Sequence, residues 1–332
     1  MTGYGVDDKM IFTEFLPAKP HRLWKLARQM GVTHAIVKAA PELTGLNPPW
    51  DKSVLASIQA QFVAEGLTVQ GLEGDQFDMS RIKLGLPGRD EDIEKYQTML
   101  ANMGELGIHL LCYNFMAGIG WFRSGGQLGR GGALATGFRL SEVPAGLTEA
   151  GEVSREQIWK NYEYFVKAVL PVASQNGVRM CLHPDDPPLP VLRGMGRIFD
   201  TVDAFDRAYA LYPHPANGVT FCQANFKLMG ADVAATARHF GQRIGFIHVR
   251  DVQGTAEDFV ELFHDEMELD QPALFRLYAE LGLNVPVRCD HVPTMAGEEK
   301  DADFVPGYGT LGRLFAVGYF KGILQTLKVN YS

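Results

Sequence analysis

The sequence predicts an α/β fold in which eight βα units close into one barrel, the TIM-barrel architecture. Short, β-rich apolar runs alternate with longer segments of helical spacing along the 332 residues. Such an alternation requires a parallel sheet covered by helices. The eight repeats follow one another without the change of composition that marks a linker. This favours a closed, single-domain barrel over residues 1–332, rather than an open doubly wound sheet with a small extra domain.

The strands are predicted from eight short runs that are apolar and rich in β-branched or aromatic residues. Parallel strands of a barrel are buried on both faces, so near-continuous apolar runs are expected for them. In chain order the runs are MIFTEF (10–15), THAIVKA (33–39), TVQGLEG (68–74), HLLCYNF (109–115), RMCLHP (179–184), GVTFCQA (218–224), IGFIHVRD (244–251) and VPVRCDH (285–291).

The helices are predicted between these runs, where the segments are longer and their apolar residues recur at helical spacing. Each of them would return the chain to the start of the next parallel strand. The candidates are HRLWKLARQM (21–30), EDIEKYQTMLANMGEL (91–106), REQIWKNYEYFVKAVLPVASQ (155–175), FDTVDAFDRAYALY (199–212), ADVAATARHF (231–240), QPALFRLYAELG (271–282) and LGRLFAVGYFKGILQTL (311–327).

One connection, residues 116–154, is much longer than the others and has a glycine-rich centre. Long irregular connections in compact domains are usually lids, binding loops or disordered segments. This one leaves the C-terminal end of the fourth strand, and sites in such barrels form at that end. We therefore expect a lid over the mouth of the barrel, with a merely mobile insertion as the alternative.

Composition narrows the class of protein. The net charge of −8, the pI near 5.6 and the lack of a Lys/Arg cluster weigh against a nucleic-acid partner. No apolar run approaches the roughly 20 residues of a membrane span, and the first residues lack the features of a secretory signal. The four cysteines lie in or at the ends of apolar runs, as in proteins of a reduced compartment. We expect a cytoplasmic protein without disulfides.

Four residues with metal-binding side chains occupy matching positions on four successive predicted strands. His183 ends the fifth strand, Cys222 is near the end of the sixth, His248 near the end of the seventh, and Asp290 at the end of the eighth. In a barrel these positions converge on one side of the mouth. Imidazole, thiolate and carboxylate together suit Mn²⁺, Fe²⁺ or Zn²⁺ better than Ca²⁺ or Mg²⁺. Each residue alone could equally be a packing residue, so the prediction of a metal site depends on their coincidence.

Neighbouring residues extend this group. Asp185 and Asp186 could orient a ligating imidazole or bind substrate hydroxyls, and Arg250 could bind a substrate carboxylate. His291 and Tyr308 are candidates for acid–base work, although His291 can reach the site beside its neighbouring aspartate only if the strand ends or bends there. Loop capping and packing are the alternative roles for these residues.

The chain resembles a known family. The stretches YFVKAVLPVASQNGVRMCLHPDDPP, GVTFCQANF, IHVRD, RCDH and PGYGTLGRL, in this order, are similar to the mannonate dehydratases of the xylose-isomerase-like barrel superfamily. LCYNFMAGIGWFRS is similar to that family's CYNFMP…DWTR stretch, which makes Tyr113, Asn114 and Arg123 candidates for substrate binding. The stretches CQANF and RCDHVPTMAGE depart from the family's CTGS and RPDHG patterns.

The resemblance implies a lyase that depends on Mn²⁺ or Fe²⁺ and removes water from a sugar acid to give a 2-keto-3-deoxy acid. It places the metal ligands on the four strand-end residues identified above and the catalytic pair on His291 and Tyr308. It also implies a homo-oligomer, a dimer or larger. The alternatives are a metal-dependent isomerase, epimerase or lyase that acts on another hydroxy acid or a keto sugar, and a barrel that binds a sugar acid without converting it.

Overall fold

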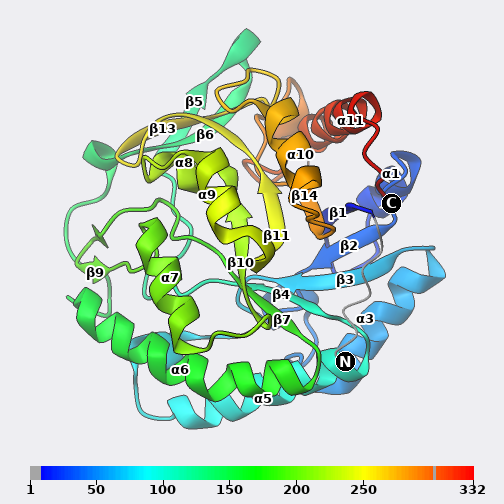
Figure 1. Cartoon of the computed structure of the whole chain (residues 1–332). Coiled ribbons are helices and arrows are strands. Elements are labelled where there is room, and N and C mark those ends of the chain that lie inside the picture. Colours follow the sequence, from blue (N-terminus) through cyan, green and yellow to red (C-terminus); the bar gives the residue numbers. More distant parts are fainter. Residues whose placement is uncertain (1–8, 302–303) are drawn as a thin grey trace.

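The protein folds as a closed barrel of eight parallel strands surrounded by helices, as predicted (Figure 1). The computed structural model describes residues 9–301 and 304–332. The predicted absence of a secretory signal concerns the first eight residues and lies outside the described part. Around the barrel the strands follow the order β1-β14-β11-β10-β7-β4-β3-β2, so chain neighbours are also neighbours in space.

All eight predicted strands are present, with ends that shift by a few residues. The run 218–224 ends two residues early, because its last two residues already belong to a short helix. The barrel strands are β1 (Ile11–Leu16), β2 (His34–Val37), β3 (Thr68–Glu73), β4 (Leu110–Tyr113), β7 (Arg179–Leu182), β10 (Asn217–Cys222), β11 (Ile244–Val249) and β14 (Pro286–Cys289).

The seven predicted helices are also present, and the described residues contain four further α-helices that had not been predicted. The longest of these, α3, carries the same signals as the others: Asp51 accepts a hydrogen bond from the Ser53 amide as its N-cap, and apolar residues recur along one face. The helices are α1 (Arg22–Gln29), α2 (Pro41–Thr44), α3 (Lys52–Ala64), α4 (Ser80–Leu84), α5 (Arg89–Glu105), α6 (Arg155–Gln175), α7 (Val202–Leu211), α8 (Gln223–Leu228), α9 (Val233–Phe240), α10 (Gln271–Glu280) and α11 (Thr310–Leu327).

Burial explains why the strands read as continuous apolar runs. Every residue of β10 and β11 is buried, because one face of each strand fills the barrel and the other packs against helices. Capping side chains fix where several helices begin. Ser154, Thr201, Asp232 and Asp270 each accept a hydrogen bond from a backbone amide in the first turn of α6, α7, α9 and α10. The C-terminal ends of the strands lie at the same side of the molecule because all eight strands run parallel in the barrel.

A second, four-stranded antiparallel sheet lies beside the mouth of the barrel, and we call it the cap sheet (Figure 1). It joins two connections, the one after β4 and the one after β11. The prediction that residues 116–154 are irregular is therefore wrong in part, because they contain two of the strands, and the hairpin after β11 had not been predicted. The cap sheet consists of β12 (Asp251–Thr255), β13 (Asp258–Leu262), β6 (Leu134–Arg139) and β5 (Gly125–Leu128), in this order.

A small hairpin of β8 (Val191–Leu192) and β9 (Met195–Gly196) completes the structure after β7. Isolated bridges tie the long connection to this hairpin and to the segment after β14, at Val153–Met195 and Leu134–Thr294. In the described part of the chain, no helix combines the length and apolar character needed to cross a membrane.

Candidate active site

A cavity of about 130 Å³ lies at the C-terminal ends of the barrel strands. Residues from the barrel rim form most of its wall, and Met116 and Trp121 from the long connection contribute to it. The position is the one at which enzymes of this architecture bind their substrates. The lining residues are Glu73, Gly74, Cys112, Tyr113, Asn114, Met116, Trp121, His183, Asp186, His248, Arg288, Asp290, His291 and Tyr308.

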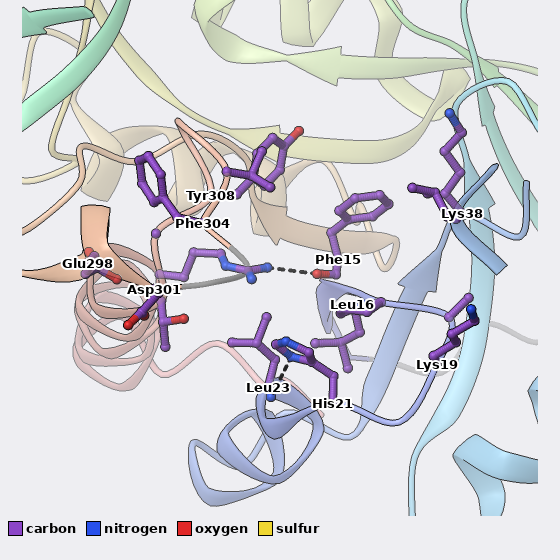
Figure 2. Close-up of a pocket in the computed structure, with 17 residues that line it drawn as sticks. Phe15, Leu16, Lys19, His21, Leu23, Lys38, Glu298, Asp301, Phe304 and Tyr308 are labelled. Atoms are coloured by element: carbon purple, nitrogen blue, oxygen red, sulfur yellow. Dashed lines mark hydrogen bonds between the residues drawn. The ribbon is translucent and has the colours of Figure 1, made fainter. Parts of the chain in front are cut away.

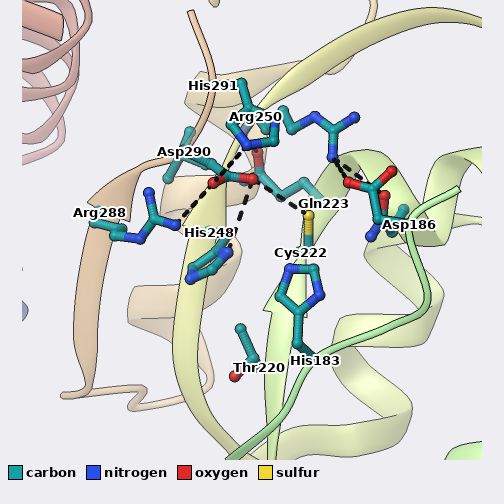
Figure 3. A network of polar contacts seen from close by, with 12 residues as sticks. His183, Asp186, Thr220, Cys222, Gln223, His248, Arg250, Arg288, Asp290 and His291 are labelled. Carbon is teal, nitrogen blue, oxygen red and sulfur yellow. Dashed lines mark hydrogen bonds and ion pairs between the residues drawn. The ribbon is translucent and has the colours of Figure 1, made fainter. Parts of the chain in front are cut away.

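Beside this cavity, the four predicted metal ligands come together. Each of His183, Cys222, His248 and Asp290 offers one ligand atom, and these atoms all lie within 4.8 Å of one another. Asp290 Oδ2 is 3.9 Å from the sulfur of Cys222 and 3.8 Å from Nδ1 of His248 (Figure 3). The barrel register explains the convergence, because Cys222 is paired directly with His248 across β10 and β11. Sequence separations of up to about a hundred residues thus become contacts.

The donor set fits a divalent transition metal. Both ring nitrogens of buried His248 lack a hydrogen-bond partner, which is costly for a buried polar group unless something binds it. His183 contacts the Pro184 carbonyl oxygen with Nδ1 at 2.7 Å, which leaves Nε2 available as a ligand. Imidazole nitrogen, thiolate sulfur and carboxylate oxygen are a combination typical of Mn²⁺, Fe²⁺ or Zn²⁺ sites.

Without a metal, burial shifts these groups toward their neutral forms. Burial and the neighbouring His248 lower the pKa of His183 to about 4, so its imidazole is neutral at pH 7. Burial also raises the pKa of the Cys222 thiol to about 12. Burial alone would raise the pKa of Asp290, but the nearby His291 and Arg288 hold it well below its ordinary value. The ligand set therefore offers one permanent negative charge and would gain a second if the thiol lost its proton to solvent on binding a metal.

Two charged residues at this rim were missed at the sequence level. Arg288 donates to Glu73 Oε2 at 2.9 Å through Nε and to Asp290 Oδ1 at 2.8 Å through Nη2. Burial alone would raise the pKa of Glu73, but Arg288 and His248 bring it to about 2. Together with Cys112 and His248, Glu73 forms a second group that could hold a metal. Glu73 lies at the end of β3, so the strand-end argument applied to the other ligands could have found it.

The proposed acid–base pair is adjacent to the metal ligands. Because β14 ends at Cys289, the chain is free to turn both Asp290 and His291 into the cavity, as the prediction required. Nε2 of His291 is 3.1 Å from the hydroxyl of Tyr308, and Nδ1 is 2.9 Å from Glu261 Oε1. Burial raises the pKa of Tyr308 above its ordinary value, so the phenol is protonated at neutral pH.

The arginines expected to bind a substrate carboxylate are engaged elsewhere. Arg250 contacts Asp186 Oδ2 at 2.8 Å (Figure 3). It also contacts Glu261 Oε1 at 2.7 Å. Arg123 makes two hydrogen bonds to the same aspartate, at 2.7 and 2.9 Å, and two to Glu261 Oε1, at 3.1 and 2.6 Å. Neither guanidinium lines the cavity. In this geometry both arginines form ion pairs with Asp186 and Glu261 outside the cavity wall. This arrangement differs from the expected one, in which an arginine binds the substrate carboxylate.

Three further candidates have mainly structural contacts. Asp185 accepts hydrogen bonds from the amides of Ile198 and Phe199 and does not line the cavity. Tyr113 and Asn114 do line it, but their polar atoms face other protein groups: the Tyr113 hydroxyl is 3.1 Å from that of Tyr162, and Asn114 Oδ1 accepts from Lys83 and from a backbone amide.

All four cysteines are buried and free, as predicted. Cys181 packs against two glycines of neighbouring strands: a Cβ on Gly245 would come within 2.5 Å of its sulfur, and one on Gly218 within 3.0 Å. Cys181 is thus a packing residue of the barrel interior, whereas Cys222 faces the other ligands.

A larger cavity of about 450 Å³ adjoins the site. It lies between the ends of β1 and β2 and the start of α11, and Phe15, Leu16 and Phe304 give it apolar walls (Figure 2). Tyr308 lines both cavities, and its ring centroid is 6.0 Å from that of Phe15. These two rings separate the polar cavity from the apolar one.

Comparison with known proteins identifies relatives along nearly the whole chain. The sequence profile of the D-mannonate dehydratase (UxuA) family matches residues 9–143 and 132–332. Mannonate dehydratase 2 of Halalkalibacterium halodurans is 30% identical over 309 residues, which cover 84% of this chain and 88% of the relative. A mannonate dehydratase of Streptococcus equi subsp. zooepidemicus is 30% identical over 329 residues, with 87% and 89% covered.

Solved structures agree with these relatives. The crystal structure of mannonate dehydratase from Streptococcus suis serotype 2 superposes with a TM-score of 0.86 at 29% identity and covers 98% of this chain and 97% of that one. D-psicose 3-epimerase from Clostridium cellulolyticum H10 shares only the fold, with a TM-score of 0.59 and 14% identity over 96% and 98% of the two chains. The chain belongs to the D-mannonate dehydratase family.

Proposed function

We propose, from this family membership, that the protein is a hydro-lyase that converts D-mannonate to 2-keto-3-deoxy-gluconate and water with Mn²⁺ or Fe²⁺ as cofactor. The observation that carries the proposal is one juxtaposition in the cavity. A set of nitrogen, sulfur and oxygen ligands lies next to a histidine and a tyrosine that are 3.1 Å apart. A dehydratase of sugar acids needs both groups within reach of one small substrate.

The metal would be held by His183, Cys222, His248 and Asp290. When bound, it would supply Lewis-acid stabilisation of the negative charge that develops on the substrate's carboxylate oxygens as the C2 proton leaves. Arg288 donates to Asp290 and so keeps this carboxylate ionised and oriented. The same arginine lines the cavity, where its charge adds to the attraction for an anionic substrate.

His291 and Tyr308 would carry out the proton transfers. The reaction removes a proton from C2 and delivers one to the departing hydroxyl of C3, and the resulting enol becomes the 2-keto product. A side chain that exchanges a proton must be within hydrogen-bond reach of the reacting group. Both side chains line the cavity, and one nitrogen and one oxygen face each other there, which suits a pair that divides the two transfers.

Trp121 of the long connection would contribute to substrate binding. Its indole ring lies 5.2 Å from the ring of His291, in an edge-to-face arrangement, and it forms part of the cavity wall. Residues 116–154 would then act as a lid that excludes water from the reaction. The four free thiols support action in the cytoplasm. The family resemblance supports a homo-oligomer, whose mass can be measured by light scattering in solution.

The test is to load anaerobically purified protein with Mn²⁺, incubate it with a panel of hexonates and pentonates, and assay the 2-keto-3-deoxy product. We expect turnover of D-mannonate, within the ordinary enzymatic range of roughly 1–10³ s⁻¹, and loss of turnover after chelation. Bound metal without turnover of any acid would refute the dehydratase proposal and direct the search to keto sugars and larger hydroxy acids.

A further inference from the structure

We infer that Glu261, a residue of the cap sheet, is the positioning residue of the acid–base pair: its carboxylate fixes the proton of His291 on Nδ1 and so turns the lone pair of Nε2 toward Tyr308. The inference rests on the proposed function, because it assigns a role within the same reaction. Sequence reasoning gave no sign of it, since Glu261 lies in a connection that was not predicted to form a strand.

The geometry of Glu261 is well defined. Its side chain is fully buried, and Oε1 is 2.9 Å from Nδ1 of His291. The same oxygen contacts Arg123 at 2.6 Å and Arg250 at 2.7 Å, and Oε2 accepts a hydrogen bond from Thr136. Four partners from four segments thus hold the carboxylate in one place. Because the carboxylate of Glu261 is fixed by these partners, it determines the orientation of the His291 imidazole.

The charge of Glu261 decides which nitrogen of His291 carries the proton. Burial alone would raise the pKa of Glu261, but Arg250, His291 and Arg123 hold it well below its ordinary value. An ionised carboxylate only accepts hydrogen bonds, so Nδ1 of His291 must donate. In the neutral ring Nε2 then has no proton and accepts from the Tyr308 hydroxyl, which is 3.1 Å away and protonated.

The arrangement places Nε2, rather than Nδ1, at the reacting side of the ring. Nε2 lies toward Tyr308 and toward Asp290, whose Oδ1 is 3.6 Å away. The opposite nitrogen faces the cap sheet. A carboxylate, an imidazole and a hydroxyl in series form the arrangement by which a buried acid orients a histidine in many hydrolases, here between the cap sheet and the loop before α11.

The inference also gives the cap sheet a part in the reaction. β13 supplies Glu261, β6 supplies Thr136, and the segment before β5 supplies Arg123. The two cap-sheet connections therefore meet at a single carboxylate. The contacts that join the two cap-sheet connections also orient His291, whereas the proposed metal ligands lie at the ends of the barrel strands.

The kinetic test compares wild-type, Glu261→Gln and Glu261→Asp proteins, all loaded with Mn²⁺ and assayed on D-mannonate. The glutamine can offer either an oxygen or an amide to Nδ1 and no longer fixes the proton. We expect kcat to fall about 10²-fold with KM changed less than about 3-fold and metal content unchanged, since partners that orient such groups are typically worth 10–100-fold. The aspartate variant keeps the charge and should recover part of kcat.

The matched control is Asp258→Asn on the same strand. Asp258 is 67% exposed and its ion pair with Arg139 lies at the outer end of the cap sheet, so kcat should not change. An unchanged kcat in Glu261→Gln, or a loss explained entirely by lost metal, would overturn the inference.

A second readout does not depend on turnover. In ¹⁵N-labelled wild-type protein loaded with diamagnetic Zn²⁺, histidine nitrogen shifts report which ring nitrogen carries the proton, and His291→Gln identifies the signal. We expect the neutral ring of His291 to be protonated at Nδ1. A neutral ring protonated at Nε2 would overturn the inference. The result stands even if no hexonate is a substrate, so the failure of the inference and that of the proposed function can be distinguished.

Discussion

Two regions meet at the candidate active site and are built on different principles. The barrel rim, at the ends of β7, β10, β11 and β14, places the four metal ligands through the hydrogen-bond register of parallel strands. The cap sheet places Arg123, Thr136 and Glu261 through buried charges and hydrogen bonds that converge on one another. The difference predicts that binding of a metal and orientation of the proposed acid–base pair are separable. Changes at the rim should remove the metal, and changes in the cap sheet should lower the rate while the metal stays.

The largest effect is expected at the rim, for His248→Ala. No described hydrogen bond depends on the His248 ring, so its removal should leave the fold intact and cost the site one ligand. We expect metal content below about a tenth of the wild-type value and a fall in kcat/KM of at least about 10³-fold, a typical scale for a lost essential group. Metal analysis of dialysed protein and steady-state kinetics measure both.

His109→Ala is the matched control for this variant. His109 is exposed, and its ring contacts the Gly177 carbonyl oxygen at the far end of the barrel. A His248→Ala protein with full metal content would contradict the assignment of this ligand.

The next effect is expected at the acid–base pair, for Tyr308→Phe. The substitution removes the hydroxyl that faces Nε2 of His291 and leaves the metal ligands untouched. General acid–base groups typically contribute 10²–10⁴-fold, so we expect kcat to fall about 10³-fold with metal content preserved. Tyr113→Phe is the control: its hydroxyl faces Tyr162 in the core, and kcat should not change. Equal losses in the two variants would show that Tyr113 also acts on the substrate.

A third effect concerns the free energy of unfolding and compares a buried arginine beside the cap sheet with an arginine at the surface. Arg250 is fully buried between Asp186 and Glu261, and its replacement by Met leaves two buried carboxylates with fewer partners. Breaking a buried pair in this way costs about 3–5 kcal/mol of unfolding free energy. Urea unfolding measures it, with Arg139→Met, an exposed ion-paired arginine of β6, as a control that should unfold like the wild type. Equal midpoints for all three proteins would contradict the role given to the buried charges.

The smallest effect is a pH dependence that starts from His264, just after β13. Its Nε2 is 2.8 Å from the Val249 carbonyl oxygen, and burial lowers its pKa from 6.5 to about 4. At a pH between these two pKa values, His264 is protonated in the unfolded chain but neutral in the folded protein. The free energy of unfolding therefore falls as the pH falls. Relative to His264→Gln, the wild type should lose up to about 3 kcal/mol between pH 7 and pH 4. A parallel pH profile for the two proteins would contradict the shift.

Much of the barrel and the ligand set could be predicted from the sequence for a physical reason. In a parallel barrel, the end of each strand has one possible location, so a residue such as Cys222 or Asp290 can be placed at the rim without any long-range information. The same rule would have found Glu73. Helix α3 was missed although its N-cap and apolar spacing were visible in the sequence.

The cap sheet could not be predicted in the same way. Its strands are short, β5 is mostly exposed and glycine-rich, and the partners lie in connections more than a hundred residues apart. The ion pairs of Arg250 could not be predicted for a related reason. From the sequence a strand-end arginine looks free to bind a substrate, and only the fold brings Asp186 and Glu261 to it. Buried charge networks are defined by their tertiary partners.

The central claim, a metal held at the rim through Cys222, is tested most directly by replacing the metal with Co²⁺ and recording the absorption spectrum. Cobalt bound to a thiolate has an intense charge-transfer band in the near ultraviolet. We expect this band in the wild type and in Cys181→Ser, whose sulfur packs against glycines, and its loss in Cys222→Ser. A band that persists in Cys222→Ser, or one that never forms although Co²⁺ binds in a 1:1 ratio, would contradict the assignment of Cys222 as a ligand.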